Sequence, residues 1–411
     1  MDNRYSWLEE EWRQMEQEAT TRSLQAVEPS FEAQGTWIFV EGRRLLNLSS
    51  NNYLGLAHDR RIVDAGASAA HRWGAGGTAS RLVNGNYALY EELEKKLAVW
   101  KQRESALVFA NGYQANTGVI SALVGRGDIV FSDRWNHASI VDGIILSRAK
   151  HVRYRHNDLG HLEELLSRHR HAGRKWIITD SIFSMDGDKA HIAELVGLKE
   201  RFGAMLIVDE AHGGGVRADE GQGLCHEMGV AKKVDVLIGT FSKAFGVYGA
   251  YACADQVVIR YLTSKARSLI YSTALPPAII GSVLEALSLV QTETWRRDTV
   301  KKNAVLFRQM LRSRGFLVGD GDTPIIPLML GANELTLQYS KLLSERGISA
   351  VAIRPPTVPA GRARIRFTVM ATHTLAELEW AADQLAAIHG ELMQSDLASF
   401  VPSCIGQPKE G

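Results

Sequence analysis

The stretch Met205-Leu-Ile-Val-Asp209-Glu-Ala-His212 decides the fold, because an apolar run ends in a carboxylate and an imidazole follows three residues later. A second apolar run, Val236-Leu-Ile-Gly-Thr240-Phe-Ser-Lys243, ends in hydroxyls and a lysine. The lysine lies 34 positions after the aspartate, close to one strand–helix–strand step. Ligands of open α/β sheets bind just outside the carboxyl ends of the strands. We therefore expect Asp209, His212 and Lys243 to share one site.

Two other interpretations of these motifs were weighed. Helicase-type ATPases also carry a Val-Asp-Glu-Ala-His strand end, but they need a Gly-Lys-Ser/Thr phosphate loop, and the chain has no Gly-Lys pair. An aspartate at a strand end can also simply cap the next helix, and for the first motif alone that alternative stays open. A lysine beside Thr240 and Ser242 is a candidate for a Schiff base, which requires its pKa to be lowered by burial or a nearby cation. Asp209 would then keep a pyridine nitrogen protonated.

The rest of the chain alternates helical and extended patterns. Apolar runs separated by amphipathic segments are typical of a largely parallel sheet covered on both faces. An amphipathic arm over 5–26, a hairpin turning at Glu41-Gly42 and a long helix from Pro277 to about 315 are also expected. The expected strands are 106–110, 129–132, 176–179, 205–208, 236–238 and 249–254, and the helices between them include 88–101, 159–170 and 192–202.

The last hundred residues predict a smaller α+β unit with strands near 324–330, 349–354 and 362–370. In the third of these strands the alternation places Arg364 and Arg366 on one face and Ile365 and Phe367 on the core side. We expect four parts: an arm and hairpin (1–45), a large domain (46–290), a small C-terminal domain (291–395) and a flexible tail (396–411).

Composition excludes several classes of function. The 411 residues carry 47 basic and 46 acidic side chains, for a net charge of +1, so no overall field favours nucleic acid or acidic membranes. Three widely spaced cysteines make neither a disulfide framework nor a zinc motif. The acidic, polar first residues do not resemble a signal peptide, and no apolar run approaches a membrane span. We expect a cytoplasmic protein that binds no metal, membrane or nucleic acid.

From about residue 45 to 390 the chain resembles the α-oxoamine synthases, which are fold-type-I pyridoxal-phosphate enzymes. The likeness rests on Asp209, His212 and Thr240-x-x-Lys243, together with Asn51-Asn52-Tyr53, Asn111-Gly112-Tyr113, Asp133-x-x-Asn136-His137 and Phe183-Ser184-Met-Asp-Gly187. The resemblance implies a mainly parallel seven-stranded sheet, with pyridoxal 5'-phosphate held as an aldimine on Lys243.

The resemblance also implies roles for the site residues. Catalysis would depend on Lys243, Asp209 and His137, with His137 stacked on the cofactor ring. Ser272 and Thr273 would reach the phosphate of a neighbouring subunit, which implies a homodimer with shared active sites. The other cofactor contacts would be Gly112 and Tyr113 at the phosphate end, Ser184, His212 at the phenolic oxygen, and Thr240 at the phosphate.

The segment Arg354-Pro-Pro-Thr357 resembles one branch of the family, the 8-amino-7-oxononanoate synthases, which join L-alanine to a pimeloyl thioester in biotin synthesis. By that likeness Arg366 grips the amino-acid carboxylate, and Arg354, Thr357 and Asn52 contact substrate. Arg22 is expected at the distal carboxylate of the acyl chain, with a solvated helix-face charge as the alternative. Condensation of glycine with an acetyl thioester and a non-catalytic cofactor-binding protein remain as alternative functions.

Overall fold

The computed structural model describes residues 4–394, which form two compact units. The large unit contains Asn51–Ser184 and Asp188–Asp298. The small unit contains the chain up to Ser50, the short segment Met185–Gly187 and the chain from Thr299 onward. The N-terminal residues, expected to form a separate part, thus group with the C-terminal unit. The expected tail, 396–411, lies outside the described residues.

A seven-stranded sheet forms the centre of the large unit, in the order β4-β10-β9-β8-β7-β5-β6, as the family resemblance implies. Only β10 runs antiparallel to its neighbours, and the remaining pairs are parallel. Its strands are β4 (Ser105–Phe109), β5 (Ile129–Asp133), β6 (Lys150–Tyr154), β7 (Lys175–Asp180), β8 (Ala204–Asp209), β9 (Val236–Thr240) and β10 (Ala250–Ala254).

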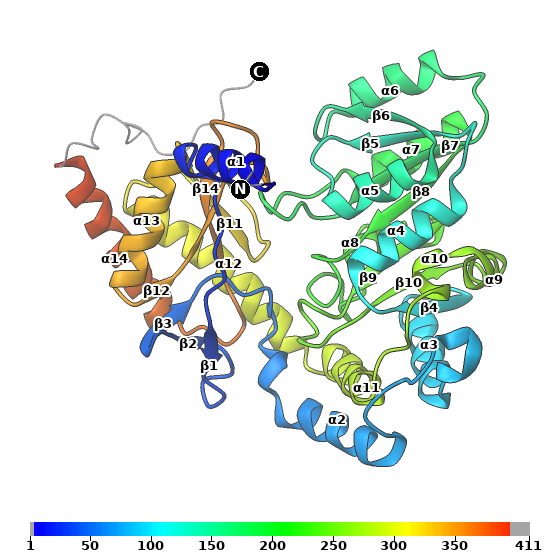
Figure 1. The fold of residues 1–411 in the computed structure, drawn as a ribbon, viewed down its shortest axis with the longest axis horizontal. Coiled ribbons are helices and arrows are strands. Elements are labelled where there is room, and N and C mark those ends of the chain that lie inside the picture. Colours follow the sequence, from blue (N-terminus) through cyan, green and yellow to red (C-terminus); the bar gives the residue numbers. More distant parts are fainter. Residues whose placement is uncertain (1–3, 395–411) are drawn as a thin grey trace. The chain divides into compact units, whose positions relative to one another are not determined.

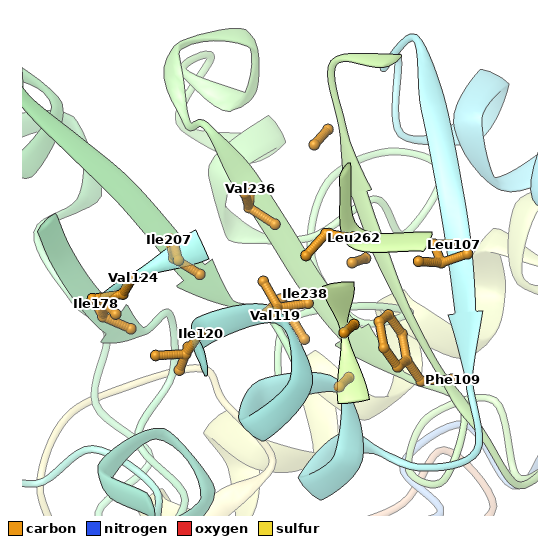
Figure 2. Packing of buried hydrophobic residues seen from close by; sticks show 14 of the residues in the cluster. Leu107, Phe109, Val119, Ile120, Val124, Ile178, Ile207, Val236, Ile238 and Leu262 are labelled. Atoms are coloured by element: carbon orange, nitrogen blue, oxygen red, sulfur yellow. The ribbon is translucent and has the colours of Figure 1, made fainter. Parts of the chain in front are cut away.

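Helices cover both faces of this sheet because most of its strands are apolar on both sides. On one face Ile178, Ile207 and Ile238 pack against Val119 and Ile120 of α4 (Figure 2). The other face includes Ile177 and Leu206, and α7 packs against β8 there (Figure 1). The helices are α2 (Arg60–Trp73), α3 (Ala88–Trp100), α4 (Gly112–Leu123), α5 (Ala138–Ser147), α6 (Leu159–Arg168), α7 (Ile192–Phe202), α8 (Leu224–Glu227), α9 (Gln256–Lys265), α10 (Arg267–Ile270) and α11 (Pro277–Thr292), with short turns η1 (Leu56–His58), η2 (Arg81–Gly85) and η3 (Ala231–Lys233).

The small unit has two sheets, ordered β1-β2-β3-β12 and β11-β14-β13. Strand β3 near the N-terminus pairs in parallel with β12, so that Leu46 lies opposite Ile348. This pairing explains why the first fifty residues belong to this unit. Its elements are α1 (Ser6–Gln17), β1 (Val27–Pro29), β2 (Trp37–Val40), β3 (Arg43–Asn47), β11 (Ile325–Gly331), α13 (Asn333–Glu345), β12 (Ile348–Ser349), β13 (Val351–Ile353), β14 (Ala363–Thr368) and α14 (Leu375–Met393).

Several expected elements differ from the structure. The long helix after Pro277 is two helices, α11 and α12 (Thr294–Ser313), because Glu293 leaves the helical region with φ −95° and ψ 66°. The N-terminal arm is helical only to Gln17, and none of its helical residues is buried. Strand β14 is buried on both faces, so Arg364 and Arg366 are buried as well as Ile365 and Phe367.

No helix in residues 4–394 is both long enough and apolar enough to span a membrane.

Candidate active site

A cavity of about 190 Å³ lies at the carboxyl edge of the seven-stranded sheet. Three strands end there in polar residues: β7 in Asp180, β8 in Asp209 and β9 in Thr240. Because Asp180 and Asp209 are register partners, their strand ends lie next to each other. The cavity is lined by seven of the expected site residues: Gly112, Tyr113, His137, Asp209, His212, Thr240 and Lys243.

Asp209 is almost fully buried, and each of its carboxylate oxygens accepts a hydrogen bond. The Asn116 amide donates to Oδ2 at 2.7 Å, and the Ala211 backbone N–H donates to Oδ1 at 2.8 Å. Asn116 lies on α4, one turn after Gly112, and also donates to Ser139 Oγ at 2.9 Å. These two donors fix the orientation of the Asp209 carboxyl group at the edge of the cavity.

Lys243 and His212 are joined by a hydrogen bond of 2.8 Å between Nζ and Nε2. On the other side of the imidazole, Nδ1 lies 2.6 Å from the Tyr53 hydroxyl, which in turn donates to Asn51 Oδ1 at 3.2 Å. One tautomer satisfies all three contacts: Nδ1 carries the proton and Nε2 accepts from the lysine amine. The chain of contacts orients His212 and holds the end of Lys243 in the cavity.

His137 begins helix α5 and turns its ring toward the cavity. Its Nδ1 lies 2.7 Å from Ser139 Oγ and accepts from the Ser139 N–H, which leaves Nε2 for another partner. Partial removal of the ring from water is the main cause that lowers its pKa, and the charge of Lys243 acts in the same direction. A neutral imidazole beside the cavity can pack flat against an aromatic ligand.

Asp180 is a second cavity carboxyl, which the sequence interpretation missed. Its Oδ2 accepts the His137 backbone N–H at 2.8 Å. Burial, followed by the charge of Asp209, raises its pKa well above the ordinary value. Asp180 ends β7 as Asp209 ends β8. The signal that pointed to Asp209, a carboxylate at the end of an apolar strand, was therefore present at Asp180 too. Asn116 closes the motif Asn111-Gly112-Tyr113-Gln-Ala-Asn116 that resembles the family, but no role of its own could be assigned to it from the sequence.

The opposite end of the cavity suits an anion. Gly112 is the first residue of α4, so the backbone N–H groups of a helix start face the cavity beside the Thr240 hydroxyl. Thr240 Oγ1 donates to Gly249 O at 2.9 Å and accepts from the Ser242 N–H at 3.1 Å. Tyr113 is half exposed and hydrogen-bonds to Asp142. The helix start can hold a phosphate, and the Thr240 hydroxyl can donate to the same phosphate by turning its proton away from Gly249 O.

Three expected cofactor contacts do not line this cavity: Ser184, Ser272 and Thr273. Ser272 accepts a hydrogen bond from Gln114, 3.4 Å away, and Thr273 forms an isolated bridge with Ser80. Asn52, an expected substrate contact, also lies outside the lining, and its side chain accepts from the Ala57 N–H at 3.2 Å.

Three expected substrate contacts meet in a different cavity, of about 600 Å³, within the small unit: Arg22, Arg354 and Thr357. Arg22 Nη2 donates to Thr357 Oγ1 at 2.8 Å. Arg354 donates to the carbonyl oxygens of Ala19 and Thr21. Burial, followed by the charge of Arg22, lowers the pKa of Arg354, so the two guanidiniums are close enough to repel each other. Arg22 follows the end of α1, so it is not on a helix face, but its side chain is exposed to solvent as that alternative expected.

Arg366, expected to grip a carboxylate, lies on β14 with 7% of its surface exposed. Its Nη1 donates to Thr368 Oγ1 at 3.3 Å. The neighbouring Arg364 is engaged by the Asp186 carboxylate and the Arg362 carbonyl.

No group of three or more metal-ligating side chains occurs within the described range, 4–394.

The family of aminotransferase class I and II matches residues 43–385. The chain belongs to that family. It is 51% identical over 385 residues to a Bacillus cereus protein provisionally named 8-amino-7-oxononanoate synthase, covering 93% of this chain and 97% of the relative. Members of the family with this fold are pyridoxal-phosphate-dependent, and the chain is a transferase of that kind.

Two solved structures are similar over most of the chain. One is a serine palmitoyltransferase from S. paucimobilis solved with a PLP–myriocin aldimine, at TM-score 0.89 and 28% identity, covering 95% of this chain and 98% of the other. The second is an 8-amino-7-oxononanoate synthase from Francisella tularensis, at TM-score 0.73 and 27% identity, covering 84% and 97%. The chain is thus similar both to a serine palmitoyltransferase and to an 8-amino-7-oxononanoate synthase.

Proposed function

We propose that the protein condenses L-alanine with a pimeloyl thioester, carried on coenzyme A or on a carrier protein. The products are 8-amino-7-oxononanoate, carbon dioxide and the free thiol, and the reaction serves biotin synthesis. The observation that carries this choice is the pair of guanidiniums, Arg22 and Arg354, in one cavity with Thr357. A pimeloyl chain ends in a second carboxylate, which acetyl and palmitoyl chains lack, and guanidinium is well matched to carboxylate.

The residues of the sheet-edge cavity fit the cofactor by their chemistry. When bound, pyridoxal phosphate withdraws electrons from the α-carbon of the amino acid. Gly112 and Thr240 would hold its phosphate, Asp209 its ring nitrogen, and Lys243 its aldehyde carbon, with His137 against the ring face. The support is the donor set itself: an amine, a carboxylate with two donors behind it, and a helix start in one cavity.

Lys243 has a second role in this proposal, as the base that takes the proton from the α-carbon of alanine. His212 hydrogen-bonds the amine at 2.8 Å, which keeps Lys243 within reach of that carbon. His137 is assigned to the release of carbon dioxide, since its Nε2 remains available beside the cavity. Arg366 is assigned to the amino-acid carboxylate, and Asn52 and Ser184 remain proposed contacts of substrate and cofactor.

We further propose a homodimer, because Ser272 and Thr273 lie outside the cavity of their own chain. Hydroxyls supplied by a second copy would complete the phosphate site. Sedimentation at assay concentration tests this idea, and a fully active monomer would contradict it. The two described cysteines, Cys225 and Cys253, are free and buried, which suits the reducing cytoplasm.

The substrate choice is tested by steady-state kinetics of the loaded enzyme. L-Alanine, glycine and L-serine are each assayed with pimeloyl-, acetyl- and palmitoyl-CoA. We expect the highest kcat/KM for alanine with pimeloyl-CoA. A preference for glycine with acetyl-CoA, or for serine with palmitoyl-CoA, would replace the proposed substrates while leaving the cofactor chemistry intact.

A further inference from the structure

His156 lies outside the cavity lining, yet its imidazole bridges two carboxylates that belong to different segments. It follows β6, and its Nδ1 is 3.0 Å from Asp133 Oδ1 at the end of β5. Its Nε2 is 2.7 Å from Asp188 Oδ2, in the segment that follows Ser184. Ionised carboxylates only accept hydrogen bonds, so both ring nitrogens must donate, and the ring is an imidazolium.

The surroundings support the charged form. The His156 side chain is 13% exposed, and that of Asp133 is 1% exposed. Burial alone would lower the pKa of His156, but the hydrogen bonds to Asp133 and Asp188 outweigh it and raise the pKa to about 9. The next residue reinforces the bridge, because Asn157 donates its backbone N–H to Asp133 and its amide to Asp188, each at 2.8 Å.

The bridge reaches the loop that ends in His137. The Trp135 indole stacks on the His156 ring with centroids 3.9 Å apart and planes 22° apart. The same Asp133 oxygen that contacts His156 also accepts the Trp135 backbone N–H at 2.8 Å. His156 thus holds the first half of the loop from Asp133 to His137 through a carboxylate and an aromatic face. The second half is held to the end of β7 at Asp180, which donates its backbone N–H to Asn136 Oδ1 and accepts the His137 N–H at its carboxylate.

The Asp188 side of the bridge is anchored to its own loop. Ile182 and Lys189 form a bridge, and the Phe183 N–H donates to the Asp188 carbonyl at 3.0 Å, so the intervening segment is closed on itself. The Phe183 ring also meets the His156 ring edge-on at 4.4 Å. This closed segment gives His156 a second support besides Trp135.

We propose that His156 is a positioning residue for the cofactor site: as an imidazolium held by Asp188 and Asp133, it sets the orientation of Trp135 and thereby of the His137 ring. The proposal rests on the proposed function only in that His137 faces the cofactor ring. It does not depend on which amino acid or thioester is used. If the His156 bridge only stabilised the fold, replacing His156 would not change how the bound cofactor is oriented.

The test compares His156→Gln with the matched control His171→Gln, a change at an exposed histidine. The readouts are the dissociation constant of pyridoxal phosphate and the visible circular dichroism of the bound cofactor, which depends on the groups stacked on it. We expect His156→Gln to weaken cofactor binding about tenfold, as for the loss of one charge-assisted hydrogen bond, and to change the visible band. Lower thermal stability with unchanged binding and band would show a purely structural role.

The mediation by His137 is tested by repeating His156→Gln in a His137→Ala background. Since the proposed effect passes through the His137 ring, the added loss of affinity should fall below about twofold there. An undiminished effect would overturn the proposal. Should His156→Gln not fold, Asp188→Asn supplies the same comparison, because that side chain is 37% exposed and the substitution keeps its shape. Because neither readout needs substrate, failure here differs from failure of the proposed reaction.

Discussion

The two cavities of this protein are built in different ways. The sheet-edge cavity takes its polar groups from the ends of β7, β8 and β9 and from the start of α4, and each group is fixed by hydrogen bonds to its neighbours. The arginine cavity of the small unit takes Arg22 from irregular chain after α1 and Arg354 from the end of β13. The groups proposed for chemistry lie at the ends of strands of one sheet or in the loops next to them, whereas Arg22 and Arg354, proposed for the choice of thioester, lie in irregular chain of the small unit. Changes in the first cavity should therefore affect kcat, and changes in the second KM.

Of the substitutions that test this difference between the two cavities, Lys243→Ala should have the largest effect. The change deletes both the proposed cofactor attachment and the proposed base, so turnover should fall by about 10³-fold or more. The variant should also lose the visible absorbance that borohydride otherwise traps on a peptide containing Lys243. Both are measured on purified protein with added cofactor. Cofactor trapped at another lysine would contradict the assignment.

Asp209→Asn should have the next largest effect, a decrease in kcat of about 10²-fold. An amide has one oxygen where the carboxylate offers two, so it cannot accept from both Asn116 and Ala211 without turning its NH₂ toward a donor. It also cannot supply the negative charge that keeps a ring nitrogen protonated. Steady-state kinetics measure the effect. The control is Asp64→Asn, the same substitution at an exposed position on α2. Activity within a few-fold of wild type would make Asp209 merely structural.

In the arginine cavity, Arg22→Gln and Arg354→Gln should each raise the KM for pimeloyl-CoA about tenfold, as for one lost charge-assisted bond. The KM for alanine and the activity with acetyl-CoA should change little, because neither carries the distal carboxylate. Lys341→Gln, on the exposed side of α13, is the control of equal charge change. Equal losses with pimeloyl- and acetyl-CoA would assign these arginines to the thiol carrier instead.

The smallest expected effect concerns stability and pH. Because folding raises the pKa of His156 from 6.5 to about 9, the bridge contributes fully below pH 6.5, and its contribution is lost as the pH rises through 9. This rise in pKa corresponds to roughly 3 kcal/mol. The Tm difference between wild type and His156→Gln should therefore shrink from pH 6 to pH 9.5. The other titratable groups around the bridge are Asp133, Asp188, Asp180 and Tyr154, which both proteins retain. A Tm difference independent of pH would mean that the ring is neutral.

Much of the fold was predictable because its signals are local. The apolar runs that became β5, β7, β8 and β9 are buried on both faces, so each stands out in the sequence. Strand β6 was missed because it lies at the sheet edge, where Lys150 and Arg153 are exposed and interrupt the apolar pattern. The break at Glu293 was missed because no glycine or proline marks it.

Site residues could be predicted from the sequence where a polar residue stands at or just after the end of an apolar strand. Asp209 and Lys243 were predicted that way, and both line the sheet-edge cavity. Asn116 and the Asp133–His156–Asp188 bridge were not found, because their roles depend on contacts between segments far apart in the chain. Arg22 was placed only by resemblance, and its hydrogen bond to Thr357, 335 positions away, has no local signal.

Because β3 pairs with β12, β3 cannot complete its pairing on the ribosome until β12 has been translated. The register partner of Leu46 is Ile348, which is translated about 300 residues later. At roughly 5–20 residues per second, that delay is on the order of 15–60 s. Throughout it the hairpin of β2 and β3 has its outer edge unpaired, with Leu45 and Leu46 uncovered. The edge of β3 is thus available for wrong pairing during most of elongation, and slower translation lengthens that period.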